Sequence, residues 1–339
     1  MANPQEDLSR WGLYCFAPRA RRTPHTLVRE QGNGALLYAA RRGVRPHEFG
    51  VAPPSEERLA GLVEFGLLER RGDLFTTAFP VLGPEIMAEL RAGLAPLAER
   101  TAARAAPAAR RIGAELAGQG LPDSVYAIVF GYALDGLLWP ALARRVPLPD
   151  TTLTPERPWW NGAFWAVYPP RPGAAGTNFV RSASGTLTMV WTDATQSHLR
   201  ALARAESGAV LREPLAPRGE GEVIDGDGRV WRLRRPDGRL ALPVVGVAGP
   251  LDEQAEAIAE EVVDALVTPD ARRIGALVDA APEVATVVLA HEFIWSVAQG
   301  LVASGTCPPP PSLAQPLRPE STPVDLLFFE VPNAPAGAG

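Results

Sequence analysis

Residues 109–114 read Ala-Arg-Arg-Ile-Gly-Ala, and residues 271–276 read the same six letters again. The flanks of both copies carry the same landmarks in the same order: Gly-Pro before a helix, an apolar run, and an aromatic strand that ends in proline. In the first copy these landmarks are residues 83–84, 125–142 and 164–169. In the second copy they are residues 249–250, 284–301 and 327–332. Landmarks that recur in order at a spacing of about 160 residues are typical of a duplicated domain.

The repeat predicts the α+β fold class, with an internal duplication that gives two similar helix-rich units carrying short β-hairpins. We expect the first unit to span residues 1–170 and the second, a degenerate repeat of the first, to span 171–333. Residues 334–339 are expected to form a disordered tail. A chain of 339 residues is long enough for two such cores. Two similar units in one chain can form a pseudo-dimer with a shared interface.

Charge and composition narrow the functional classes. The net charge of −5 excludes a globally basic nucleic-acid coat protein. Every basic side chain is arginine, and with abundant Ala, Pro and Gly this favours a bacterial source with a GC-rich genome. The first 46 residues carry eight arginines against three acidic residues. This asymmetry indicates either an anionic partner or a solvated arginine-rich surface.

Several features favour a cytoplasmic protein without a membrane span. The two cysteines form no metal or disulfide pattern, and residues 1–7 lack the basic start and apolar run expected of a signal peptide. The most apolar segments, 124–143 and 284–303, are interrupted by Asp135 in the first and by His291 and Glu292 in the second. These interruptions favour buried core helices over membrane-spanning ones.

Local patterns predict the main helices and strands. Proline is favoured at the first position of a helix, so Pro84 and Pro107 are each expected to begin one. In the first half we predict a strand over 11–16, one helix over 26–42, a helix that begins after Ser55, a hairpin over 67–79, and helices from Pro84 toward Arg104 and from Pro107. In the second half we predict strands over 178–181 and 186–191, a hairpin over 230–247, and helices over 252–266, 269–278 and 282–303.

Residues 34–83 carry a pattern that indicates a known fold. The helix after Ser55 has leucines at helical spacing, Gly66-Leu67 begins a short hairpin, and Thr77 leads out of it toward Gly83. This pattern resembles the winged helix-turn-helix superfamily of bacterial regulators, in which the hairpin is the wing and the next helix often dimerises. The resemblance implies a winged-helix-like region over about 24–83 that binds duplex DNA.

The arginines near this region are the candidate DNA-binding residues: Arg41, Arg42, Arg45, Arg70 and Arg71. Two departures from the superfamily argue against DNA binding. The first turn of the helix that would enter the groove carries Glu56 and Glu57, which phosphates repel. The wing is also very short. A winged-helix-like scaffold that does not bind DNA is therefore the alternative.

The sequence carries no recognisable catalytic motif, so no catalytic residue, metal ligand or cofactor is assigned. It lacks a nucleophile elbow, a phosphate-binding loop and a dinucleotide fingerprint. His291-Glu292 has no second histidine four residues on, which excludes a zincin site. Whether the protein is an enzyme stays open, since the absence of a motif never excludes catalysis.

Aromatic residues in the apolar helices and strands suggest a ligand site. Tryptophan offers a large apolar wall with one polar group, so several in one cleft could bind a small apolar molecule. An aromatic core is the alternative interpretation. Asp135 and Glu292 interrupt the two matching helices and would be the polar anchors if they face one cavity. The candidate ligand-binding residues are Asp135, Trp139, Trp165, Trp191, His291, Glu292 and Trp295.

Three functional hypotheses follow. The first is a non-enzymatic cytoplasmic regulator of transcription that binds duplex DNA and senses a small molecule. The second is a ligand-binding or protein-interaction module without nucleic-acid binding, which a negative first turn of the Ser55 helix would favour. The third is an enzyme of unrecognised type, which a pocket holding His291, Glu292 and Asp135 together would favour. An oligomer is compatible with each.

Overall fold

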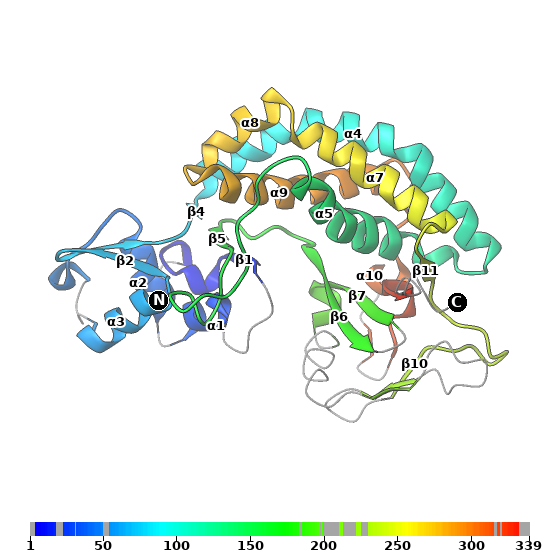
Figure 1. The fold of residues 1–339 in the computed structure, drawn as a ribbon, viewed down its shortest axis with the longest axis horizontal. Coiled ribbons are helices and arrows are strands. Elements are labelled where there is room, and N and C mark those ends of the chain that lie inside the picture. Colours follow the sequence, from blue (N-terminus) through cyan, green and yellow to red (C-terminus); the bar gives the residue numbers. More distant parts are fainter. Residues whose placement is uncertain are drawn as a thin grey trace. The chain divides into compact units, whose positions relative to one another are not determined.

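The computed structural model shows a mixed fold of helices and short strands (Figure 1), which confirms the predicted α+β class. The predicted tail over 334–339 lies outside the described residues. The structure describes residues 4–17, 23–30, 32–49, 54–182, 185–196, 198, 210–212, 222–224, 230–314, 317–318 and 321–331.

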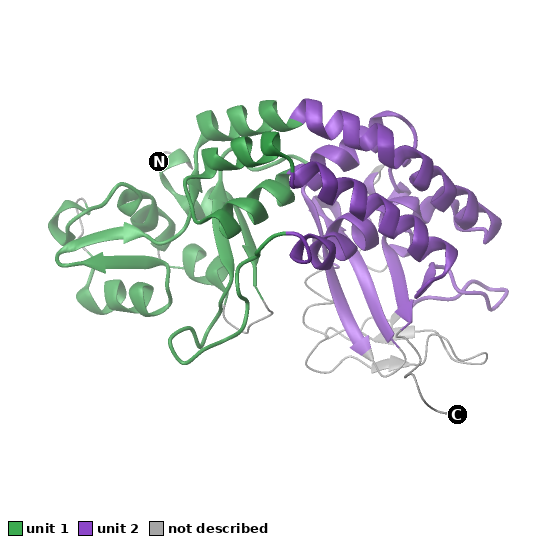
Figure 2. Cartoon of the chain, turned by 45° about the horizontal axis from the view of Figure 1, so that its top comes forward, with its two compact units in different colours: residues 1–94, 146–172, 268–292 green, residues 95–145, 173–267, 293–339 purple. Residues whose placement is uncertain are grey.

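The chain divides into two compact units whose segments alternate along the sequence (Figure 2). Unit 1 comprises residues 1–94, 146–172 and 268–292, and unit 2 comprises residues 95–145, 173–267 and 293–339. Each unit therefore takes segments from both halves of the sequence repeat.

The N-terminal part of unit 1 begins with two helices where the sequence predicts one. Helix α1 (Pro24–Arg29) ends before Gly32, which adopts a left-handed conformation with φ of 73°. Helix α2 (Asn33–Ala40) begins directly after Gly32, and the Asn33 side chain donates a hydrogen bond to the Leu27 carbonyl. The prediction of a continuous helix over 26–42 was wrong because glycine adopts this conformation without steric cost.

A third helix and a hairpin complete this part of unit 1. Helix α3 (Glu56–Glu64) begins after Ser55, whose hydroxyl caps it by accepting from the Arg58 N–H. Strands β2 (Leu68–Arg71) and β3 (Leu74–Thr77) pair antiparallel, as predicted, and Val44 bridges to Phe75. Leu37, Leu59 and Phe75 are completely buried in the core that joins these elements.

The remaining strands form three further sheets. In unit 1, β5 (Ala163–Val167) lies between antiparallel β1 (Gly12–Phe16) and parallel β4 (Val81–Leu82). In unit 2, the order is β11 (Val244–Gly246), β12 (Leu327–Val331), β7 (Gly185–Thr192) and β6 (Ala175–Ser182). A small antiparallel sheet comprises β8 (Val210–Arg212), β9 (Glu222–Ile224) and β10 (Val230–Arg232). The hairpin predicted over 230–247 is confirmed only at its turn, where Arg234 bridges antiparallel to Leu240 around Pro236-Asp237-Gly238. Its flanking strands do not pair with each other, since β10 pairs with β9 and β11 pairs with β12.

Two of these sheets share one strand arrangement. Strand β12 is antiparallel to β7 and parallel to β11, just as β5 is antiparallel to β1 and parallel to β4. Val81 lies opposite Ala166 in unit 1, and Val244 lies opposite Phe329 in unit 2. The number of residues from Val81 to Val244 equals the number from Ala166 to Phe329, so the two pairs are in the same register. Trp165 and Phe328 therefore hold matching positions in the two central strands.

The long helices contain one further departure from the prediction. Helix α4 (Pro84–Gly118) runs through Pro107, where a new helix was predicted to begin. In the matching segment, α7 (Pro250–Leu266) stops and α8 (Pro269–Gly275) starts anew. There the Thr268 side chain caps α8 by accepting from the Ala271 N–H. The residue before Pro107 is alanine, which offers no such cap, and the helix continues.

Two apolar helices form much of the core. The first consists of a π-helix, η5 (Ala127–Leu137), followed by α5 (Leu138–Ala143); the second is α9 (Pro282–Ala303). Both are apolar and long enough to cross a membrane by length and composition, but most of each is buried within the structure, as in core helices. The short helices are η1 (Pro4–Glu6), η2 (Leu8–Arg10), η3 (Pro46–Glu48), η4 (Pro122–Ser124), η6 (Asp193–Thr195), η7 (Ala276–Val278), α10 (Pro311–Ala314) and η8 (Val324–Leu326).

Each apolar helix packs on a sheet from the other half of the sequence. In unit 2, η5 contacts β6, β7 and β12. In unit 1, His291 of α9 lies against Tyr14 of β1 and Trp165 of β5. The matching contact in unit 2 is made by Tyr132 of η5 against Phe328 of β12. Each helix thus contacts strands from the other half of the sequence.

Replacing Gly131 of η5 with alanine should destabilise unit 2. A Cβ atom there would lie 2.5 Å from Val190 Cγ2 and 2.9 Å from Phe328 Cε1, and both neighbours are buried. We expect the free energy of unfolding to fall by about 1–3 kcal/mol in denaturant titrations. Gly118→Ala is the control, because its Cβ would meet nothing within 4 Å. Equal stability of the two variants would contradict this close helix–sheet packing.

Candidate functional site

A pocket of about 330 Å³ opens in unit 2 between the π-helix η5 and the sheet. One wall comes from η5 and α5, and the other comes from β6, β7 and β12. The polar and aromatic residues that define it are Asp135, Thr177, Phe179, Arg181, Thr188 and Glu330. π-Helices are rare and occur frequently at functional sites, so the position of this pocket beside one is notable.

Asp135 is a carboxylate that the helix side contributes to the pocket. Its Oδ2 atom accepts a hydrogen bond from the Thr177 hydroxyl at 2.7 Å, and the Trp139 side chain also hydrogen-bonds to it. Burial disfavours the charged carboxylate and raises its pKa to about 6, although these hydrogen bonds act in the opposite direction. Asp135 is therefore ionised at neutral pH in an environment that resists its charge.

A second carboxylate lies on the strand side of the pocket. The Thr188 hydroxyl donates to Glu330 Oε1 at 2.8 Å. Burial raises the pKa of Glu330, while the Thr188 hydrogen bond and the positive charge of Arg181 lower it. The Arg181 guanidinium lies over the Phe179 ring, 4.8 Å from its centroid. The pocket thus contains two carboxylates and one guanidinium.

Tyr132 fixes the π-helix beside the pocket. Its ring meets Phe328 edge-on with centroids 5.7 Å apart, and its hydroxyl donates to Asp252 Oδ1 at 2.7 Å. The other oxygen of Asp252 accepts from the Ala248 N–H. Burial and the Asp252 hydrogen bond raise the pKa of Tyr132, so it stays protonated and donates at any ordinary pH.

Small residues keep the pocket open. Thr188 lies opposite Phe328, and Tyr14 lies opposite Trp165 at the matching position in unit 1. The Tyr14 ring fills its position by packing against Trp165 and His291, with centroids 5.9 and 4.5 Å away. Thr188 has no ring, and Gly136 of the facing helix has no side chain. The space that Tyr14 fills in unit 1 is therefore part of the pocket in unit 2.

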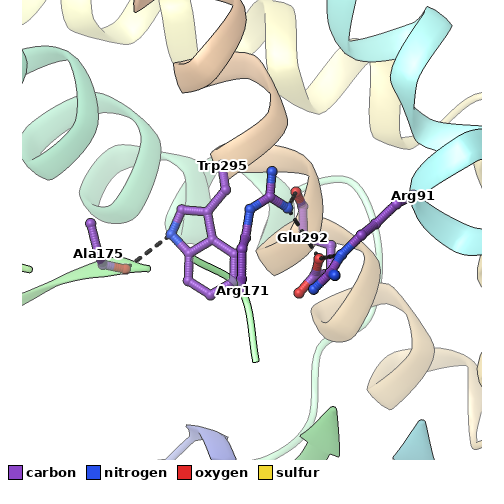
Figure 3. Close-up of polar contacts among 5 residues, drawn as sticks. All are labelled: Arg91, Arg171, Ala175, Glu292 and Trp295. Carbon is purple, nitrogen blue, oxygen red and sulfur yellow. Dashed lines mark hydrogen bonds and ion pairs between the residues drawn. The ribbon is translucent and has the colours of Figure 1, made fainter. Parts of the chain in front are cut away.

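Glu292 belongs to a buried ion cluster in unit 1, shown in Figure 3. Its carboxylate is completely buried and pairs with Arg91 at 3.0 Å and Arg171 at 3.1 Å. The adjacent His291 has its pKa lowered to about 3 by burial and by Arg171, so its ring is neutral at pH 7. A paired carboxylate and a neutral ring in the core are typical of a structural cluster.

The structure distributes the predicted ligand-binding residues over different sites. Asp135 lines the unit 2 pocket, and Trp139 supports it. Trp165, His291 and Glu292 belong to unit 1, so the pocket does not hold them together with Asp135. Trp295 is buried, with its indole N–H donating to the Ala175 carbonyl (Figure 3). Trp191 is half-buried and packs closely on Gly176.

Sequence reasoning missed the strand residues of the pocket. Thr177, Phe179 and Arg181 alternate along β6, so they share one face of the sheet. Thr186 and Thr188 alternate likewise along β7. Polar residues at every second position of these strands lie on a face that was expected to meet an apolar helix. This pattern was the sequence signal that could have indicated the pocket.

Four of the five candidate DNA-binding arginines make contacts within unit 1. Arg41 lies over the Tyr38 ring, and Arg42 is exposed. The other three form exposed ion pairs: Arg45 with Glu48 and Asp73, Arg70 with Glu56, and Arg71 with Glu69. Exposed pairs of this kind are weak and exchange readily, so they reduce the positive potential without removing the arginines from solvent.

The exposed face of α3 is acidic. Glu56, Glu57 and Glu64 are exposed, and the residues between them on this face are Ala60 and Gly61. Arg58 is the one basic residue of the helix, and it donates to the Asn33 side chain at 2.8 Å. A nucleic-acid phosphate would meet negative charge on this face.

Among the described residues, no group of three or more His, Cys, Asp or Glu side chains is placed to hold a metal ion. No protein-family model, curated protein or solved structure matches the chain.

Asp135→Asn should change how stability depends on pH. The pKa of Asp135 is about 6 in the folded chain against an ordinary 3.8, so the folded state binds the proton more tightly. The free energy of unfolding should therefore fall as the pH rises from about 4 to 6, and the asparagine variant should lack this loss. The free energy of unfolding of the variant, relative to that of the native chain, should therefore rise by about 1–2 kcal/mol from pH 4 to pH 7. This figure is discounted because the Asp135 side chain is partly exposed.

The measurement is a series of denaturant titrations across this pH range. Asp123→Asn serves as the control, since Asp123 is an exposed aspartate of the same unit. A difference between Asp135→Asn and the native chain that stays constant from pH 4 to pH 7 would show that Asp135 titrates normally.

Proposed function

We propose that this protein is a non-enzymatic ligand-binding module, whose small-molecule site is the pocket beside η5 in unit 2. The observation that carries this proposal is the Asp135 carboxylate. Its pKa is raised to about 6 by burial, and it is oriented by a hydrogen bond from the Thr177 hydroxyl. Ionisable groups held in unfavourable surroundings are concentrated at binding and catalytic sites.

The walls of the pocket support the same proposal. A typical small-molecule site combines apolar and aromatic walls with a few convergent polar groups. Tyr132 and Phe328 supply aromatic surface, and Asp135, Thr188 and Glu330 supply polar groups from facing elements. The volume of about 330 Å³ is at the lower end of the range for ligand pockets.

We propose in addition that the chain arose by internal duplication and that its N-terminal region, over about 24–83, has a winged-helix-like shape. The duplication is supported by the matching strand arrangements and by the matched contacts of Tyr132 and His291. The winged-helix shape is supported by the order of α2, the Val44 bridge, α3 and the β2–β3 hairpin.

The acidic face of α3 favours contact of this region with protein over contact with nucleic acid. Glu56 and Glu57 occupy the turn that a DNA-reading helix brings to the groove. A cytoplasmic regulator of transcription that binds DNA is the second candidate, supported by the winged-helix order and by Arg41, Arg42 and Arg45 on the neighbouring segment. The enzyme hypothesis has less support, because His291 and Glu292 do not line the pocket of Asp135.

The ligand-binding proposal predicts that the native protein retains a small molecule in its unit 2 pocket. Native mass spectrometry of the purified chain should show an added mass that is lost on denaturation. Thr188→Tyr should abolish it, because the phenol ring occupies the pocket as Tyr14 fills the matching position in unit 1. Thr188→Ser keeps both the hydroxyl and the space, and should retain the ligand. An added mass that survives in Thr188→Tyr with unchanged thermal stability would place the ligand elsewhere.

Duplex DNA should bind weakly or not at all. In fluorescence anisotropy with random 30-base-pair duplexes at about 50–200 mM salt, we expect dissociation constants no tighter than about 10⁻⁴ M. Tighter binding that falls steeply with salt, and that is lost in the Arg41→Ala and Arg42→Ala variants, would favour the second candidate instead.

A further inference from the structure

We infer that the unit 2 pocket recognises a primary ammonium group on a short, partly aromatic body, held between Asp135 and Glu330. This inference rests on the proposed ligand-binding function and adds the chemical class of the ligand.

The charge of the pocket favours a monocation. Two carboxylates, Asp135 and Glu330, line it together with one guanidinium, that of Arg181. Arg181 lies on the exposed side, stacked over Phe179. Acidic side chains thus outnumber basic ones in the lining, and a ligand with one positive charge complements them.

The carboxylates are oriented before a ligand arrives. Thr177 donates to Asp135, and Thr188 donates to Glu330, so each acid is held by a hydroxyl on a strand facing the π-helix. A carboxylate accepts several hydrogen bonds, and an ammonium group donates three. Each acid therefore keeps the capacity to accept from an ammonium group while its threonine hydrogen bond stays in place.

The remaining walls suit an organic body. Tyr132, Phe328 and Pro140 provide aromatic and aliphatic surface beside the acids. Aromatic faces also attract a nearby cation. A metal ion suits the site less well than an organic cation, since hard metal ions take six or more oxygen ligands and the described residues hold no group of three metal-binding side chains here.

Ligand binding would also offset the cost of the buried charge. Burial penalises the ionised form of both acids. A paired ammonium group places an opposite charge beside Asp135, so part of the binding free energy comes from relieving an existing penalty.

Three probes of nearly identical shape test the inference by isothermal titration calorimetry at pH 7.5 on the full chain freed of any retained ligand. Tyramine carries an ammonium group, tyrosol carries a hydroxyl in its place, and 4-hydroxyphenylacetate carries a carboxylate. Tyramine should bind roughly 10 to 100 times more tightly than tyrosol, because a hydrogen bond to a charged group discriminates by about this factor. The carboxylate probe should bind most weakly.

Variants locate the preference within the pocket. Asp135→Asn should remove most of the preference for tyramine over tyrosol while tyrosol binding stays unchanged, and Glu330→Gln should reduce the preference further. Glu261→Gln removes an equal charge from α7 in the same unit without lining the pocket, so it should leave the preference intact. Thermal unfolding of each variant checks that the fold is retained.

The outcomes separate this inference from the proposed function. Equal or tighter binding of tyrosol or 4-hydroxyphenylacetate would overturn the ammonium preference and leave the ligand pocket standing. An ammonium preference unchanged in Asp135→Asn would place the cation at another site. No binding of any probe would overturn the inference, while a retained ligand that is lost in Thr188→Tyr would still support the proposed function.

Discussion

The packing of each apolar helix on a sheet from the other half of the sequence is the constraint on which this structure depends. In unit 2, η5 covers β6, β7 and β12, and in unit 1 α9 reaches β1 and β5 through His291. Each large apolar side chain buried in this way contributes about 1.5–3 kcal/mol. Neither helix can be left in water. The strands under η5 all come from the second half of the sequence, and His291 of α9 contacts strands of the first half, although Trp295 of α9 also bonds to β6 of its own half. The two halves must therefore fold together.

The same packing produces both the pocket and its asymmetry. A helix lies close to a sheet where the side chains between them are small, and Gly131 allows this approach in unit 2. At matching strand positions, a tyrosine fills the space in unit 1 and Thr188 leaves it open in unit 2. Asp135 enters that space from the π-helix. Two similar strand arrangements thus yield a filled core in one unit and a polar pocket in the other.

The sequence predicted local elements well and long-range pairings poorly. The α3 helix, the β2–β3 hairpin and the two apolar helices follow from caps, turn residues and periodicity, which are local signals. Gly32 divides a predicted helix because it adopts a left-handed conformation. Pro107 does not begin a new helix because the alanine before it provides no cap, and α4 continues through it. Asp135 was identified because a charge in an apolar run is visible in sequence. Its partners on β6, β7 and β12 come from distant segments that only the folded chain brings together.

Separate expression of residues 1–170 and 171–339 tests this packing between the two halves most directly. The account predicts that neither fragment alone shows a cooperative unfolding transition by circular dichroism, because each lacks the helix that covers its sheet. Co-expression of the two fragments should yield a complex that copurifies and unfolds cooperatively. Cooperative unfolding of either fragment by itself, at a temperature near that of the intact chain, would contradict the account.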